Sequence, residues 1–129
     1  MKTKAPRNKT LELSPAQTKS YAAQALTLKR AAALQEIENS IIWQDALKAM
    51  DFLPDGAVDL MIVDPPYNLT KNFGKSTFKE MGMDAYKLWL DEWLSKTVRL
   101  LKPNASVYIC ADWKTSIAIP EIAGKYFLL

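Results

Sequence analysis

The apolar run from Val58 to Val63, with the double proline behind it, constrains the fold of this chain more than any other feature. The run is interrupted only by Asp59, a pattern typical of a strand that is covered on both faces in a parallel sheet. Pro65 and Pro66 cannot continue a hydrogen-bonded ladder, so the strand must end before them. We therefore expect a buried parallel strand with Asp64 at its carboxyl end.

A helix and a second strand are expected to follow. Asp84 is a candidate N-cap, and bulky residues recur behind it at helical spacing. These residues are Tyr86, Leu90, Trp93, Leu94, Thr97 and Leu101. Lys102-Pro103-Asn104 is expected to turn the chain into a strand over residues 107–110. Strand, crossover helix and strand form the unit of a parallel α/β sheet, whose ligand sites lie outside the carboxyl ends of the strands. Asp64 and Asp112 would both lie on that side.

The remaining elements are predicted from weaker patterns. Residues 1–13 are interpreted as a basic mobile arm, and residues 14–39 as a helical segment that starts at Ser14-Pro15 and stays helical to about Leu34. A short strand is expected at residues 41–43 and a short helix at residues 45–50. Residues 68–82 are expected to form a loop, residues 115–123 a helix that Gly124 ends, and the chain from Tyr126 another strand.

Composition excludes several kinds of chemistry. The chain has one cysteine, Cys110, and no histidine among its 129 residues, which excludes an intrachain disulfide, the usual zinc sites and histidine-dependent triads. We expect no metal site, and the chemistry must come from carboxylates, aromatic rings, backbone groups or a cofactor. No apolar stretch approaches the roughly 18 to 20 residues of a membrane span, and the basic start lacks the apolar segment of a secretory signal. A cytoplasmic protein without a membrane partner is expected.

Charge is distributed unevenly along the chain. The net charge is +3, but residues 1–30 hold seven basic side chains against Glu12 alone, whereas residues 31–129 hold ten against thirteen acidic ones. A basic arm is able to contact the phosphates of a nucleic acid. A solvated tail is the more common interpretation of such a segment.

The motif Asp64-Pro65-Pro66-Tyr67 combines hydrogen-bond acceptors with an aromatic face. The exocyclic nitrogen of adenine or cytosine is a poor nucleophile because its lone pair is delocalised into the ring. The Asp64 carboxylate and the Pro65 carbonyl would accept its two hydrogens and free that lone pair, and the prolines restrict the backbone that presents the carbonyl. Stacking on Tyr67 is worth about 1–3 kcal/mol, which offsets much of the cost of extruding a base. The alternative is that the prolines merely end a strand and Tyr67 packs on the core.

These residues resemble the DNA amino-methyltransferases, which methylate adenine N6 or cytosine N4 with S-adenosylmethionine. The resemblance covers residues 40–129, which look like the catalytic half of such an enzyme in the expected order. The resemblance rests on residues 45–50, Leu53-Pro54-Asp55-Gly56, Val58-Asp59-Leu60, the Asp-Pro-Pro-Tyr motif with Asn68, Tyr86, Trp89, Trp93 and residues 100–104. The resemblance implies a three-layer, Rossmann-like methyltransferase fold, double-stranded DNA as partner, and a role in DNA methylation of the restriction-modification kind.

The same resemblance implies roles for individual residues. Asp64, Pro65, Pro66 and Tyr67 carry over as the catalytic and base-holding residues. Asp64 and Asp45 are candidates for contacting the cofactor, although a helix N-cap is an equally good interpretation of Asp45. Candidate substrate contacts are Tyr67, Asn68, Lys71 and Phe73. Residues 71–74 are a candidate for a mobile loop that closes over the flipped base, although an exposed loop without a specific role is the favoured interpretation.

Asp112 and Trp113 follow the second strand and are candidates to line the same site. For Trp113 packing in the core is the favoured interpretation, and Trp89 and Trp93 are expected to be structural.

The glycine-rich turn that usually holds the cofactor in this family has no counterpart, because the four glycines are scattered at positions 56, 74, 82 and 124. In the permuted class the catalytic motif comes first, and target recognition and the cofactor motif follow it. The chain is therefore expected to be an incomplete, N-terminal half that is inactive alone, with the cofactor site mostly outside it and a complementing C-terminal half as a candidate partner.

Two alternatives stay open. RNA and protein-glutamine amino-methyltransferases carry a related site, usually with Asn in place of Asp64, but their glycine-rich motif precedes it and none precedes it here. A non-catalytic remnant or nucleic-acid-binding module is the other alternative. Adenine and cytosine are not distinguished, because both present an amino group with the same two hydrogens.

Overall fold

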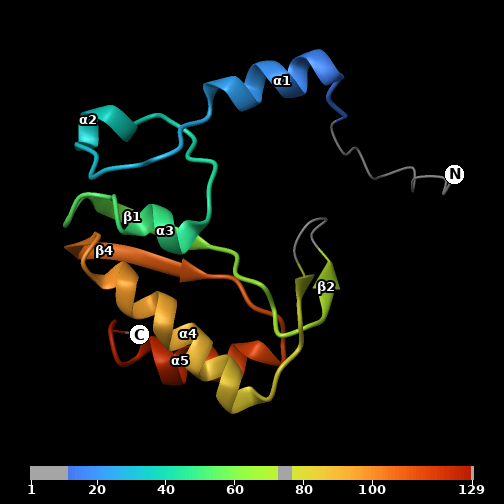
Figure 1. The fold of residues 1–129 in the computed structure, drawn as a ribbon. Coiled ribbons are helices and arrows are strands. Elements are labelled where there is room, and N and C mark those ends of the chain that lie inside the picture. The colour runs from blue at the N-terminus through green and yellow to red at the C-terminus, as the bar shows by residue number, and fades with distance from the viewer. Residues whose placement is uncertain (1–11, 73–76, 129) are drawn as a thin grey trace, which may run out of the picture.

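The computed structural model describes residues 12–72 and 77–128. It contains five α-helices, one short 3-10 helix and four strands among these residues (Figure 1). In chain order they are α1 (Pro15–Gln24), α2 (Leu34–Ile37), α3 (Ala46–Met50), β1 (Val58–Val63), β2 (Lys71–Asn72), β3 (Thr77–Phe78), α4 (Met83–Val98), β4 (Leu101–Ile109), the 3-10 helix η1 (Thr115–Ile117) and α5 (Ala118–Ala123). In the described part of the chain, no helix has the length and apolar character needed to cross a membrane.

The predicted strand, helix and strand are confirmed. β1 and β4 pair in parallel with Val63 opposite Ile109, and α4 is the crossover between them. The Cys110 amide donates to the Val63 carbonyl at 2.8 Å, which extends the pairing just beyond β4. Both strands thus end at the same edge of the sheet. The chain forms part of a parallel α/β, Rossmann-like methyltransferase fold.

The start of β4 differs from the prediction. Lys102-Pro103-Asn104 lies inside the strand, which begins at Leu101 rather than after a turn. The pairing shifts from Val58 opposite Leu101 to Leu60 opposite Ser106, so the proline segment forms an irregularity within the ladder. A proline in a strand is compatible with such a bulge because its missing N–H would otherwise interrupt the pairing.

The core lies between one face of the sheet and helices α4 and α5, which lie on the same side of the sheet in Figure 1. Its buried members are Tyr86, Leu90, Trp93, Leu94, Ala118, Ile122 and Ala123, against which Val63 and Ile109 pack. On the opposite face Leu60, Ile62 and Tyr108 are 54%, 69% and 63% exposed. The expectation that β1 is covered on both faces is therefore wrong for the described residues, because only one face receives a helix layer.

The N-terminal segment is less helical than predicted. α1 ends at Gln24, and Ala25 is already extended, so the prediction of a helix to about Leu34 is wrong. α1 buries no residue, and a helix without a packed apolar face is only marginally stable. The backbone of Leu26 instead forms hydrogen bonds with the backbone of Ile41 and Trp43. The short strand predicted at residues 41–43 is therefore only a single parallel bridge between Leu26 and Ile42.

Other boundaries also differ. The expected loop at residues 68–82 contains a short antiparallel hairpin of β2 and β3. Gly82 is the N-cap of α4, so Asp84 lies in the first turn of that helix and does not cap it. The predicted helix at residues 115–123 is confirmed as η1 followed by α5. The strand expected from Tyr126 is wrong, because the amides of Tyr126 and Phe127 both bond to the Ala123 carbonyl and continue the helix as a turn.

Candidate functional site

The Asp-Pro-Pro-Tyr motif lies directly after β1, beside the segment that follows β4. Pro65 is buried, Asp64 is exposed, and Pro66 and Tyr67 are half-buried. Because Val63 is paired with Ile109, the loop starting at Asp64 and the loop starting at Cys110 leave the sheet side by side. The motif thus occupies the edge at which parallel α/β sheets bind their ligands.

A hydrogen bond joins the acid and the aromatic ring of the motif. The Tyr67 hydroxyl donates to Asp64 Oδ1 at 2.8 Å. This bond raises the pKa of Tyr67 above its usual value. A carboxylate has about four lone-pair sites, so Asp64 keeps the capacity to accept further hydrogen bonds while it holds the ring.

Tyr86 of α4 forms a hydrogen bond with the backbone of the motif. Its side chain is fully buried, and its hydroxyl donates to the Pro66 carbonyl at 3.2 Å. Burial raises the pKa of Tyr86, and a hydrogen bond with Thr115 lowers it in part. The hydroxyl therefore ties the loop after β1 to α4. We did not predict this role, although a tyrosine on an otherwise apolar helix face was a signal, since a buried hydroxyl needs a partner.

Asn68 closes the hairpin that follows the motif. It is 8% exposed, and its side chain donates to the Met81 carbonyl at 2.7 Å and accepts from the Met81 amide at 2.9 Å. Both ends of the amide are thus engaged in joining the two ends of the hairpin. A contact of Asn68 with substrate stays a prediction. Lys71 is exposed on β2, and Phe73 and Gly74 lie outside the described residues.

Asp112 organises the loop after β4. Its Oδ1 accepts from the Lys114 amide at 3.1 Å and from the amide and hydroxyl of Thr115 at 2.8 and 2.7 Å. These bonds, first among them the one from the Thr115 hydroxyl, hold the pKa of Asp112 below its usual value. Trp113, at the tip of this turn, is 78% exposed, so its expected packing in the core is wrong.

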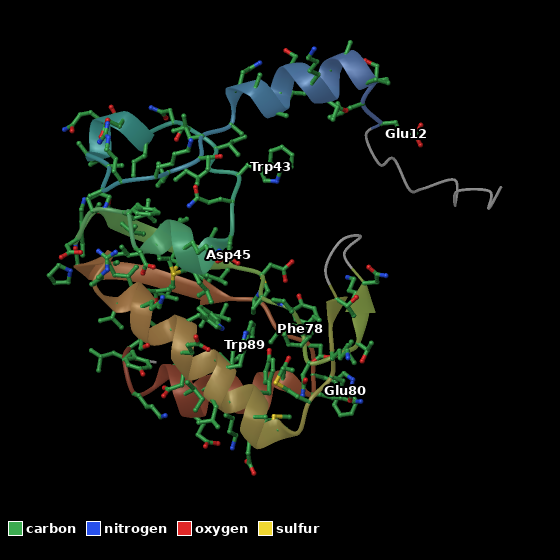
Figure 2. All side chains as sticks on the ribbon, in the orientation of Figure 1. Glu12, Trp43, Asp45, Phe78, Glu80 and Trp89 are labelled. Carbon is green, nitrogen blue, oxygen red and sulfur yellow. The ribbon has the colours of Figure 1, made fainter. Side chains whose placement is uncertain are left out.

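Trp89 and Trp93 are structural, as predicted. Trp93 is 5% exposed, and the ring of Trp89 contacts Phe78, Tyr86 and Trp93 with centroids 5.3, 5.5 and 6.2 Å away. Figure 2 shows Phe78 on the hairpin close to Trp89 on α4. The aromatic contacts join the hairpin to the helix that carries Tyr86.

Asp45 is the N-cap of α3, and its side chain accepts from the Lys48 amide at 3.0 Å. The N-cap interpretation is confirmed, and a contact of this exposed carboxylate with a cofactor stays a prediction. Figure 2 shows Asp45 at the start of α3, on the side of the molecule that also carries the hairpin.

The three glycines among the described residues lie apart from one another. Gly56 lies in a turn at φ +57°, Gly82 caps the start of α4 and Gly124 the end of α5. A dinucleotide-type site instead places glycines together between a strand and a helix. Asp45 and Asp64 are both exposed, and a contact of either carboxylate with a cofactor stays a prediction.

Sequence comparisons agree with the geometry. The family model of the N6 and N4 type, described as DNA methylase, matches residues 58–128, more than half of the chain and the part that contains the site. The type II methyltransferase M.HpaI of Haemophilus parainfluenzae is 37% identical over 95 residues, which is 70% of this chain and 30% of the relative.

Two further relatives agree with this match. The type II methyltransferase M.BamHI of Bacillus amyloliquefaciens is 30% identical over 76 residues, which cover 57% of this chain and 18% of that protein. The DNA adenine methyltransferase YhdJ of Escherichia coli (strain K12) is 40% identical over 72 residues, which cover 54% of this chain and 24% of YhdJ. The chain thus spans less than a third of the length of these relatives. On the family match, this chain belongs to the DNA methylases of the N6 and N4 type.

Proposed function

We propose that this chain supplies the base-holding part of an S-adenosylmethionine-dependent DNA methyltransferase that acts on the exocyclic amino group of adenine (N6) or cytosine (N4). The observation that carries the proposal is the hydrogen bond between Tyr67 and Asp64 at the carboxyl end of β1. It places a carboxylate acceptor beside an aromatic ring, at the edge of the sheet where ligands bind.

The chain's own residues would act on a base that has left the duplex. Asp64 and the Pro65 carbonyl would accept the two hydrogens of the amino group, which favours a nitrogen with a free lone pair. Tyr67 would stack on the base and offset part of the cost of extruding it. S-adenosylmethionine, when bound, supplies an electrophilic methyl group.

Asp64 and Asp45 are the residues we propose to face the cofactor. Most of the cofactor site would lie on residues other than these 129, supplied by a complementing C-terminal half, because the four glycines of the chain are scattered. Double-stranded DNA is the proposed partner, supported by the family match and by relatives named as type II methyltransferases.

The decisive experiment measures labelled methyl incorporation by the full-length polypeptide that carries this sequence. We expect Asp64→Ala to lower incorporation by more than about 100-fold while DNA binding is retained, since the carboxylate acts on the reacting nitrogen. Asp59→Ala is the matched control, because Asp59 is an exposed carboxylate at the start of β1 that is paired with Lys102, whereas Asp64 follows the end of that strand. The proposal would be contradicted if Asp64→Ala kept activity within a few-fold of the parent, as the control Asp59→Ala is expected to do.

One measurement on the chain of 129 residues and one on the full-length polypeptide separate the alternatives. Calorimetry with S-adenosylmethionine is expected to show weak or no binding, and tight one-to-one binding would refute the proposed location of the cofactor site. DNA binding that falls steeply with salt, in a full-length polypeptide that incorporates no methyl group, would instead favour a non-catalytic nucleic-acid-binding module.

A further inference from the structure

We propose that Trp113 is a second aromatic contact for DNA, whose ring stacks on an unpaired base next to the one held at Tyr67. The inference rests on the proposed function and adds a residue to its substrate surface. Three observations carry it: the exposure of Trp113, the rigid turn that presents it, and the position of that turn.

The exposure of Trp113 is unusual for its residue type. Tryptophan is highly buried on average, yet 78% of Trp113 is accessible. The other tryptophans of this half of the chain behave differently, since Trp93 is 5% exposed and Trp89 contacts three aromatic rings. Exposing this indole leaves a large ring face available to a ligand.

The backbone on both sides of Trp113 is held by hydrogen bonds. Asp112 Oδ1 accepts from the Lys114 and Thr115 amides, and the Ser116 amide donates to the Asp112 carbonyl at 2.9 Å. The Ser116 hydroxyl donates to the carbonyl of Trp113 itself at 3.0 Å. The turn is thus fixed before a ligand arrives, and a preorganised contact loses less entropy on binding.

The turn lies next to the base-holding motif. The segment after β4 leaves the sheet beside Asp64, because Val63 is paired with Ile109 and the Cys110 amide donates to the Val63 carbonyl at 2.8 Å. A strand of DNA whose base reached Tyr67 would therefore have its neighbouring nucleotides close to the turn.

The chemistry of the turn suits a single strand of nucleic acid. Lys114 Nζ lies 5.6 Å from the centroid of the Trp113 ring, so a cation able to meet a phosphate accompanies a face able to meet a base. Aromatic platforms beside basic groups are the usual means of binding unpaired nucleotides, and they tolerate any base because every base has a π-face.

The test uses single-stranded oligodeoxyadenylate and, as a ligand without bases, inorganic polyphosphate. Trp113→Ala should weaken oligodeoxyadenylate binding about ten-fold, within the range for loss of one stacked base, and leave polyphosphate binding unchanged. Trp113→Phe keeps an aromatic face and should stay within about three-fold of the parent. The matched control is Trp43→Ala, because Trp43 is 70% exposed but lies on the N-terminal segment (Figure 2).

Fluorescence gives an independent readout. Oligodeoxyadenylate should quench the parent protein and Trp43→Phe to a similar extent, and quench Trp113→Phe much less. Thermal unfolding should be the same for parent and Trp113→Ala, because the ring is exposed. Equal binding of oligodeoxyadenylate by the parent and Trp113→Ala would overturn the inference. The inference would also fail if acrylamide did not quench Trp113 in the protein without DNA, because other residues of the protein would then cover the indole.

The outcome is separable from that of the proposed function. If Trp113→Ala binds like the parent while Asp64→Ala still abolishes methyl incorporation, the inference fails and the proposed function stands. If Asp64→Ala methylates normally while Trp113→Ala loses binding, the stacking contact stands and the proposed function fails. Absence of any binding of DNA by the parent protein would overturn both.

Discussion

The region from β1 to α5 and the region from Glu12 to Gln44 are held in different ways. α4 buries five side chains, whereas α1 and α2 bury none. The N-terminal region is joined by backbone bonds such as Leu26 to Ile41 at 2.7 Å and Ala32 to Phe52 at 2.9 Å, and Figure 1 shows α1 and α2 set apart from the sheet and its helices. Apolar burial stabilises the first region, whereas the second region, in which α1 and α2 bury no side chain, is held mainly by hydrogen bonds. The two regions should therefore unfold with different free energies.

The largest effect is expected from Leu90→Ala. Leu90 is fully buried in the core between α4, α5 and the sheet, and truncating such a leucine costs about 2–5 kcal/mol. Leu88→Ala on the same helix is the control, because Leu88 is 73% exposed and its loss should cost less than about 0.5 kcal/mol. Urea denaturation measures both, and equal effects would show that α4 does not hold the core.

Tyr86→Phe should have the next largest effect on stability. The ring stays buried, but the half-buried Pro66 carbonyl loses the hydroxyl that donates to it, and the loss of one such hydrogen bond costs about 0.5–1.5 kcal/mol. Tyr108→Phe is the control, because Tyr108 is 63% exposed on β4. Amide chemical shifts of Asp64, Tyr67 and Asn68 should change in Tyr86→Phe alone. If the motif's shifts stay in place, Tyr86 does not position it.

A pH-dependent effect is expected from Thr115→Val. Asp112 has a lowered pKa in the folded protein, so its contribution to stability is present above its unfolded value near 3.8 and is lost as pH falls through the lower folded value. Removing the Thr115 hydroxyl raises the Asp112 pKa, which the carboxyl carbon signal reports directly. The variant should lose stability at neutral pH and approach the parent in strong acid.

Thr97→Val is the control for this pH dependence. Thr97 is equally buried, but its hydroxyl donates to the Leu94 carbonyl rather than to a carboxylate. Its effect on the free energy of unfolding should therefore not change with pH in the acid range. A parallel pH dependence in both variants would contradict the assignment to Asp112.

The sequence predicted the elements whose pattern and burial agree. β1 has the bounds of the apolar run, and the buried face of α4 is the one its helical spacing indicates. The motif at Asp64 was placed at the correct strand end because the prolines end the ladder locally. These signals need no knowledge of distant residues.

The errors arise where the outcome depends on distant residues. The helix predicted beyond Gln24 had alanine propensity but no surface to pack on, and the strand predicted at Tyr126 stayed bonded to the end of α5. Two-residue strands such as β2 and β3 carry no periodicity to detect. The exposure of Trp113 was missed because tryptophan is buried on average, whereas the position of this ring depends on the turn made by Asp112 and Thr115.

The smallest effect on global stability is expected from Ser14→Ala, which tests the independence of the N-terminal region. Ser14 and Gln17 form a capping box, with bonds of 3.2 Å from the Gln17 amide to Ser14 Oγ and 2.9 Å from the Ser14 amide to Gln17 Oε1. Loss of such a cap destabilises a helix by about 0.5–2 kcal/mol. Because α1 buries no residue, we expect faster hydrogen exchange in α1 and a change of less than about 0.3 kcal/mol in the free energy of global unfolding. A global loss as large as that of the cap would show that α1 is coupled to the core, which would remove the contrast between the two regions.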